Sequence, residues 1–174
     1  MPDLDPRTQF PLLYEREYPA VYRTIRAMVL DAHEAEDLAQ ETFVRAYRAR
    51  AGYRPEAPPG AWLHRIAVNT AISHLRKRKL RRLLPLRLYE PPRDQETDRA
   101  EARTVVEEAL ACLTPKQRAC VTMHFVHGYT REEIAHALGV PAGTVASRIA
   151  KAIALMRSRM GAGDPALGAA RSRI

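Results

Sequence analysis

Four aromatic side chains near the start of the chain recur at every fourth position, a spacing that suits a helix and not a strand. They are Phe10, Tyr14, Tyr18 and Tyr22, and the apolar stripe continues through Val21, Ile25, Met28 and Val29. We predict a core helix here, broken or restarted at Pro19, because proline lacks the main-chain donor that a helix interior needs. No strand-like alternation of apolar and polar residues stands out elsewhere, so the expected fold is all-α.

Proline-rich stretches divide the rest of the chain into two helical units. Asp31 followed by Glu34 resembles a capping box at the start of a second helix, and a loop over 51–60 precedes a third helix from Trp62 to about Leu84. Prolines among polar residues then predict a linker. We therefore expect two small helical domains, residues 9–84 and 100–160, joined by a flexible linker at 85–99 and followed by a disordered tail at 161–174.

The second unit carries the pattern of a helix-turn-helix. Thr130 and Glu133 form a capping box for a short helix, Gly139 can end it, and a second helix begins near Ala142 and continues to about Arg157. One face of that second helix is polar and cationic, which suits contacts with bases and phosphates in the major groove. Its members are Thr144, Ser147, Arg148 and Lys151.

The predicted third helix carries a different mixture along one face. An aromatic ring, an amide, a hydroxyl and cations lie within one arc, formed by Trp62, Arg65, Asn69, Ser73 and Arg76. Aromatic faces hold unstacked bases and cations follow phosphates, so this stripe suits single-stranded DNA. A dense cationic run from Arg76 and Lys77 to Arg82 suits the phosphate backbone. Taken alone, Trp62 is more often a core residue than a platform for a base.

The net charge of +8 conceals blocks of opposite sign. The segment from Asp31 to Glu41 has five acids and no base, whereas eight bases and no acid lie between Glu56 and Glu90. Such blocks predict that one face of the protein binds a polyanion while another meets a different partner. Cys112 and Cys120 cannot form a disulfide framework, and no run of about 18 apolar residues or signal pattern occurs. These features predict a cytoplasmic protein with no membrane insertion.

Two motif blocks resemble one bacterial family. Residues 36–47 (EDLAQETFVRAY) and 60–77 (GAWLHRIAVNTAISHLRK) resemble region two of the extracytoplasmic-function (ECF) sigma factors, a subfamily of the sigma-70 family. Residues 113–118 (LTPKQR) and 128–148 (GYTREEIAHALGVPAGTVASR) resemble region four of the same family. The resemblance extends in the family's order from about residue 10 to residue 160.

The resemblance implies a promoter-specificity subunit of RNA polymerase without catalytic activity or cofactor. It implies that the acidic helix docks on the clamp coiled coil of the largest polymerase subunit through Asp37, Gln40, Glu41 and Val44, while region four meets the flap. It assigns the melted downstream promoter element to Tyr53, Trp62, Arg65, Asn69 and Ser73, together with Arg76 and Lys77. The resemblance assigns recognition of the upstream element, as duplex DNA, to Thr144, Ser147, Arg148 and Lys151. An anti-sigma factor is a further partner expected from the family.

Parts of the sequence are compatible with other functions. Cys120, His124 and His127 share a helical face at i, i+4 and i+7, a spacing compatible with zinc but without a clear fourth ligand. Cys112 and Cys120 could also form a redox pair. No glycine-rich phosphate loop or convergent set of acids favours an enzyme. The main alternative is a stand-alone dimeric helix-turn-helix regulator, which would bind a palindrome without polymerase.

Overall fold

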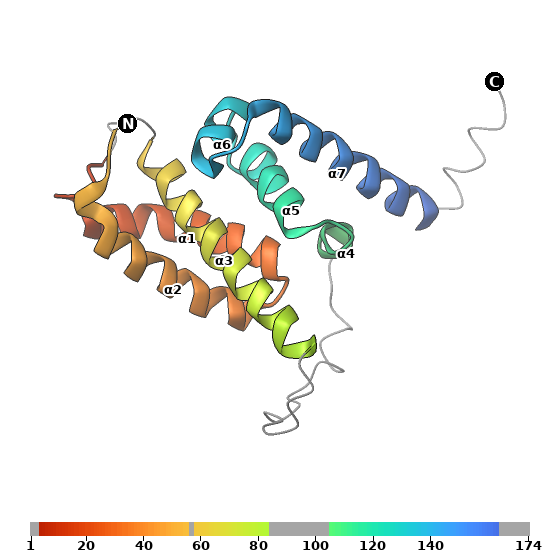
Figure 1. Cartoon of the computed structure of the whole chain (residues 1–174), viewed down its shortest axis with the longest axis horizontal. Helices are drawn as coiled ribbons and strands as arrows, with labels where there is room; N and C mark the ends of the chain where they lie inside the picture. Colours follow the sequence, from red (N-terminus) through yellow and green to blue (C-terminus); the bar gives the residue numbers. More distant parts are fainter. Residues whose placement is uncertain (1–3, 56–57, 84–104, 164–174) are drawn as a thin grey trace.

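The computed structural model describes residues 4–55, 58–83 and 105–163, and every regular element within them is a helix (Figure 1). The first unit contains α1 (Phe10–Val29), α2 (Ala32–Ala49), the short 3-10 turn η1 (Arg50–Gly52) and α3 (Pro59–Leu83). The second contains α4 (Val105–Ala111), α5 (Pro115–Val121), the π-helical turn η3 (Thr122–Val126), α6 (Arg131–Leu138) and α7 (Ala142–Gly163). The predicted all-α fold is confirmed, and the proposed linker at 85–99 lies outside the described residues.

The expected break at Pro19 is wrong, because α1 continues through it from Phe10 to Val29. An interior proline costs a helix about 3 kcal/mol or more, since a hydrogen bond is lost and the ring crowds the preceding turn. Pro19 is exposed, whereas apolar residues on both sides of it are fully buried, among them Leu13, Val21 and Ile25. Burial of one continuous apolar face therefore offsets the local cost.

Side-chain caps fix the starts of α2, α5 and α6. Asp31 accepts a hydrogen bond from the Glu34 main-chain nitrogen at 2.9 Å, but the Glu34 side chain turns to Arg78 and His74 of α3, so only half of a capping box forms. Thr130 and Glu133 form the complete capping box predicted for α6, and Gly139 ends that helix with φ of 63°. The residues of the predicted helix-turn-helix are thus held in the expected conformation.

The last helix is longer than predicted. α7 runs to Gly163, three residues into the segment expected as a tail, and residues 164–174 lie outside the described part of the chain.

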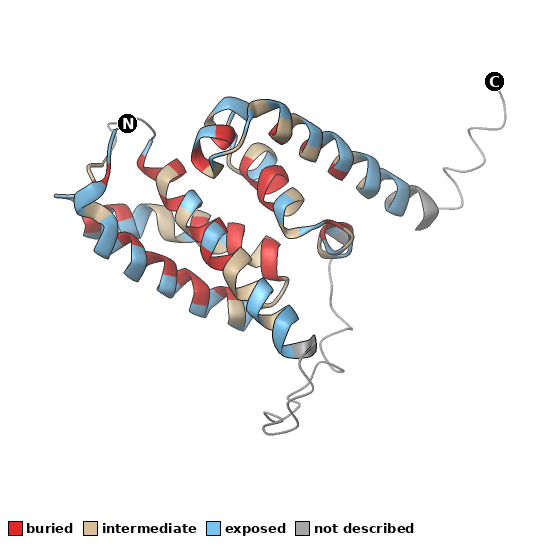
Figure 2. Cartoon of the chain, in the orientation of Figure 1, coloured by how far each residue is buried: buried red, intermediate tan, exposed pale blue. Residues whose placement is uncertain are grey.

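The two units pack against each other rather than standing apart. In Figure 1, α5 and α6 lie against the side of the first unit formed by α1 and α3. One buried apolar cluster runs through both units and includes Leu63 and Val68 from the first and Met123 and Ile134 from the second. Figure 2 shows buried residues in the helices of both units that meet at this junction. The sequence did not predict this arrangement, which places the candidate sites of the two units opposite each other.

No single helix in the described part of the chain is both long and apolar enough to cross a membrane. The pair α6 and α7 reaches that length and composition only together, across a bend of 110°.

Candidate nucleic-acid interface

The acidic helix α2 presents its predicted partner-binding residues to solvent. Its apolar face, including Leu38, Phe43 and Ala46, is buried against the neighbouring helices. The opposite side carries an exposed set that we call the α2 face: Asp37, Gln40, Glu41 and Val44. Val44 is 50% exposed amid these polar groups, and Glu41 pairs with Arg45 of the same helix at 2.5 Å. An acidic rim around an exposed valine is suited to a basic protein partner with an apolar centre.

Two aromatic residues assigned to the downstream element lie against each other at the start of α3. The Tyr53 and Trp62 rings are 5.4 Å apart in an edge-to-face arrangement. Tyr53 is 7% exposed, and Trp62 is half-buried against the core. In this structure the two rings therefore serve packing, and Tyr53 has little surface to offer a base.

The remaining residues of the predicted stripe lie along the outside of α3. Arg65, Asn69, Arg76 and Lys77 are exposed and Ser73 is half-buried, whereas the inward side of the same helix buries Leu63 and other apolar residues. We call Asn69, Ser73 and Arg76 the α3 face, because these three line one cavity together. Hydroxyl, amide and guanidinium groups at successive turns can bond both bases and phosphates.

The predicted recognition residues of α7 are also brought together. Thr144, Ser147, Arg148 and Lys151 line one groove, which we call the recognition groove, with Lys116 and Gln117 of α5 on its other side. Val145, Ile149 and Ala152 point the opposite way and are buried. Because the groove lies at the start of α7, the positive end of the helix dipole adds to the lysine and arginine charges. The arrangement is suited to an anionic ligand such as a duplex backbone.

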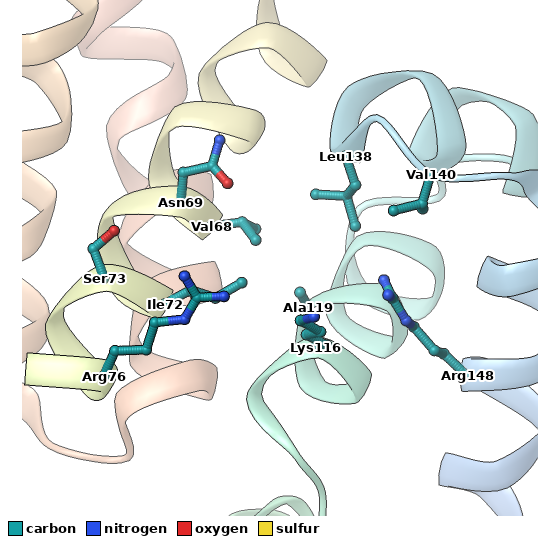
Figure 3. Close-up of a pocket in the computed structure, with 10 residues that line it drawn as sticks. All are labelled: Val68, Asn69, Ile72, Ser73, Arg76, Lys116, Ala119, Leu138, Val140 and Arg148. Atoms are coloured by element: carbon teal, nitrogen blue, oxygen red, sulfur yellow. The ribbon is translucent and has the colours of Figure 1, made fainter. Parts of the chain in front are cut away.

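The α3 face and Arg148 lie on opposite walls of one cavity between the units. Figure 3 shows Asn69, Ser73 and Arg76 on the α3 wall and Leu138, Val140 and Arg148 on the other. The cavity has a volume of about 290 Å³ and is further lined by Val68, Ile72, Lys116 and Ala119. Residues assigned from sequence to two separate DNA elements thus line one cavity, which we call the interunit cavity.

The cysteine and histidine spacing considered for zinc does not form a metal site in the described residues. No group of three or more His, Cys, Asp or Glu side chains is placed to hold a metal ion there. The π-helical turn η3 changes the helical register after Val121: His124 Nδ1 bonds the Tyr129 carbonyl oxygen at 2.8 Å, whereas His127 Nε2 bonds Thr24 of α1. In a regular helix the side chains of Cys120, His124 and His127 would have shared one face.

Both cysteines are free thiols. Cys120 is buried, and this burial raises the pKa of its thiol, while the adjacent Arg148 acts in the opposite direction. Cys112 is half-buried and donates a hydrogen bond from Sγ to the Ala109 carbonyl oxygen at 2.9 Å. In this structure neither thiol is engaged with the other, so the redox pair receives no support.

Sequence reasoning missed two sets of residues. Lys116 lines both the recognition groove and the interunit cavity. Its only signal was its place at the start of a helix opened by Pro115. The second set joins the units through Thr24, His64 and His127, with hydrogen bonds to the Thr24 hydroxyl oxygen at 3.1 Å and 2.8 Å. Their separation in the sequence left no local pattern to read.

Comparisons with known families and proteins agree with this geometry. The family model described as Sigma-70 region 2 matches residues 13–81, and that described as Sigma-70, region 4 matches residues 103–156. The chain is 34% identical over 155 residues to the ECF RNA polymerase sigma factor SigM of Mycobacterium tuberculosis, covering 89% of this chain and 79% of that one. It is also 34% identical over 145 residues to the RNA polymerase sigma-E factor of Streptomyces coelicolor, covering 83% and 82%.

Solved structures show the same fold. The sigma factor RpoE of Bartonella quintana, solved with the anti-sigma factor NepR, aligns with a TM-score of 0.69 at 22% identity over 86% of this chain and 94% of that one. CnrH, solved with the cytosolic domain of CnrY, aligns with a TM-score of 0.65 at 23% identity over 90% of each chain. Both family regions, the relatives and the fold therefore lead to one conclusion: the chain belongs to the ECF sigma factors of bacterial RNA polymerase.

Proposed function

We propose that this chain directs RNA polymerase core to a two-part promoter through three separate surfaces. The α2 face binds the core enzyme, the α3 face together with Arg65 and Lys77 binds the melted downstream strand, and the recognition groove binds the upstream element as duplex. The observation that carries the proposal is the segregation of charge: acids on α2, and cations on α3 and at the start of α7.

Each surface suits its proposed partner chemically. The α2 face offers carboxylates to a basic coiled coil, and the exposed Val44 gives that contact an apolar centre. The α3 face combines hydrogen-bonding groups with a guanidinium, as binding of unpaired bases requires. The recognition groove adds Lys116 of α5 to the cations of α7, which extends the phosphate-binding surface beyond the recognition helix itself.

We propose that the chain has no catalytic activity of its own, is located in the cytoplasm beside the polymerase, and is controlled by an anti-sigma factor.

We also propose that the two units extend over residues 9–84 and 100–160. These boundaries enclose the helices of each unit in the described part of the chain except the last turn of α7. Two weak DNA-binding units in one chain gain affinity through their effective concentration, on the order of millimolar for a short connection.

Reconstituted transcription tests the proposal. The chain, added to core polymerase with a template library of two-element promoters, is expected to give discrete start sites that core enzyme alone does not give. Chain without polymerase is expected to bind the same promoter duplex weakly. A tight footprint on a palindrome by the chain alone, with no initiation when core enzyme is added, would instead identify a stand-alone dimeric regulator.

A further inference from the structure

A buried polar cluster formed by Thr24, His64 and His127 joins the two units. Thr24 of α1 donates a hydrogen bond from its hydroxyl to the Ala20 carbonyl oxygen at 3.1 Å. The same oxygen then accepts from His64 Nδ1 of α3 at 3.1 Å and from His127 Nε2, at the end of η3, at 2.8 Å. One donated and two accepted bonds use the full capacity of a hydroxyl group, and they define the proton positions on both rings.

The two histidines lie close enough that a proton on either would be unfavourable. Their ring centroids are 4.5 Å apart, and His64 is 1% exposed. Burial, then the proximity of His127, then that of Arg23 lower the pKa of His64 to about 3. Burial and Arg23 also lower the pKa of the half-buried His127. Packing of the units therefore favours the neutral form of both rings.

The neighbouring groups do not offset this effect. Arg23 of α1 acts on both rings as a positive charge. From the second unit, the Tyr129 ring packs 5.5 Å from His64, and His124 is engaged with the Tyr129 carbonyl oxygen. Glu17 of α1 and Tyr129 both lie close to Gly60 of α3. A Cβ atom at Gly60 would be 3.2 Å from Glu17 Oε2 and 2.8 Å from Tyr129 Oη.

The same packing brings the proposed DNA-binding residues face to face. Asn69, Ser73 and Arg76 line one wall of the interunit cavity, and Lys116 and Arg148 lie on the other (Figure 3). At about 290 Å³ the cavity has room for a small molecule but not for a duplex with a melted strand beside it. The α3 face and the Arg148 end of the recognition groove therefore obstruct each other in this arrangement.

We propose that this structure is a closed form of the chain, in which the α3 face and the Arg148 end of the recognition groove lie too close together to take up DNA, and that Thr24, His64 and His127 form a latch that opens when a histidine takes up a proton. This inference rests on the function proposed above. Opening exposes His64 and His127 to water, where each can be charged at no unusual cost, and it frees both walls of the interunit cavity.

The sign of the pH dependence follows from proton binding. The closed form binds fewer protons than the open form, so a fall in pH favours opening. Histidine in water has a pKa of about 6.5, so the open-to-closed ratio rises as the pH falls below that value, by up to about tenfold per pH unit for each histidine. With both histidines present the limit is about a hundredfold per unit; with one, about tenfold. Above pH 7 the ratio is constant.

The latch can be tested on the full chain alone, without polymerase or DNA. Fluorescence donor and acceptor are placed on cysteines introduced at the exposed positions Arg48 of α2 and Ser158 of α7, in a chain carrying Cys112→Ser. Cys120 is buried and stays as it is. Energy transfer is expected to be high and constant from pH 8 to 7 and to fall reversibly toward pH 5, while helix content measured by circular dichroism stays unchanged.

Matched variants identify the latch. His127→Gln keeps a hydrogen-bonding group but cannot be charged, so its pH response should shrink to the slope of one histidine. His127 is preferred to His64 because it is only half-buried, and a substitution there is tolerated more readily. His136→Gln, at an exposed position of α6, should leave the full response. Transfer that does not change between pH 8 and 5, or a full response in His127→Gln, would overturn the latch.

The outcome is independent of the transcription experiment. A pH response that follows His127 in a chain that fails to direct initiation would support the latch while removing its proposed role in obstructing DNA binding. Initiation by a chain whose energy transfer ignores pH would support the function and remove the latch.

Discussion

Arg118 of α5 donates a hydrogen bond from Nη1 to the Met28 carbonyl oxygen of α1 at 2.5 Å, across 90 positions of sequence. Its Nε donates to the Leu110 and Leu113 carbonyl oxygens at 2.9 Å and 3.1 Å, so one guanidinium ties the start of the second unit to the end of the first helix. Arg26 and Glu107 form an ion pair between the same units.

Replacing Arg118 is expected to destabilise the whole chain. Arg118→Gln removes a guanidinium that donates to carbonyl oxygens of both units. Hydrogen bonds to a charged group contribute about 1.5 to 3 kcal/mol each. We expect the free energy of unfolding to fall by about 2 kcal/mol in urea denaturation. Arg48→Gln, at an exposed position of α2, is the control and should stay within about 0.5 kcal/mol of the parent. Equal midpoints for both variants would contradict a role for Arg118 in holding the units.

Thr24 should contribute more than another buried threonine. Thr24→Val leaves His64 and His127 without their shared acceptor, and each buried unpaired polar group costs about 1 to 3 kcal/mol. Thr42→Val is the control, because the hydroxyl of this buried threonine donates to the Leu38 carbonyl oxygen of its own helix at 2.7 Å. Thermal unfolding at pH 8 should show a clearly larger decrease in Tm for Thr24→Val. Similar decreases would mean that the interunit bonds add little.

Asn69 should matter for promoter opening and not for assembly with polymerase. Asn69→Ala removes an exposed amide from the α3 face without disturbing the core. We expect open-complex formation, followed by permanganate reactivity of unpaired thymines, to fall about tenfold, which corresponds to about 1.4 kcal/mol. Unchanged affinity for core enzyme is the internal control. Loss of core binding would show that Asn69 meets the polymerase rather than DNA.

Arg148 should act on the upstream element. Arg148→Ala removes a cation from the recognition groove, so we expect weaker use of promoters that carry the upstream element and a smaller dependence of binding on salt. Arg157→Ala changes an exposed arginine later in the same helix and serves as the comparison. If both variants lowered promoter affinity equally, the effect would be one of net charge and not of the recognition groove.

Charge reversal on the α2 face should block assembly with polymerase. Glu41→Lys places a cation where a basic partner is proposed and also repels Arg45. We expect the affinity for core enzyme in a native gel or by anisotropy to fall by at least about tenfold. Glu15→Lys, at an exposed position of α1, makes the same change in net charge elsewhere. Binding that is equally weakened by both changes would argue against the α2 face.

The helices and most of the site could be predicted from sequence because their signals are local. Thr130 and Glu133 specify the start of α6, and the period of α7 alone separates Ser147 and Arg148 from the buried Val145 and Ile149. The predicted break at Pro19 was wrong, because the cost of a proline inside a helix is offset by the burial of apolar residues on both sides of it. The spacing of Cys120, His124 and His127 did not predict their arrangement, because the π-helical turn η3 departs from the period of a regular α-helix.

The contact between the units could not be predicted, because it depends on residues that carry no shared motif. Thr24 and His127 are 103 positions apart, and a threonine in a helix interior has many possible roles. Trp62 and Tyr53 show the same limit, since an aromatic residue at a loop's end is compatible with packing or with base stacking.

The buried apolar cluster that runs through both units has a consequence for every affinity that is measured on this chain. If a partner binds only while the units are apart, its apparent dissociation constant is the intrinsic one divided by the fraction of molecules that are open. A chain that is open one time in a hundred would thus bind polymerase or promoter about a hundredfold more weakly than its contact surfaces allow. Substitutions in the cluster, far from any proposed contact, would then tighten binding by raising that fraction.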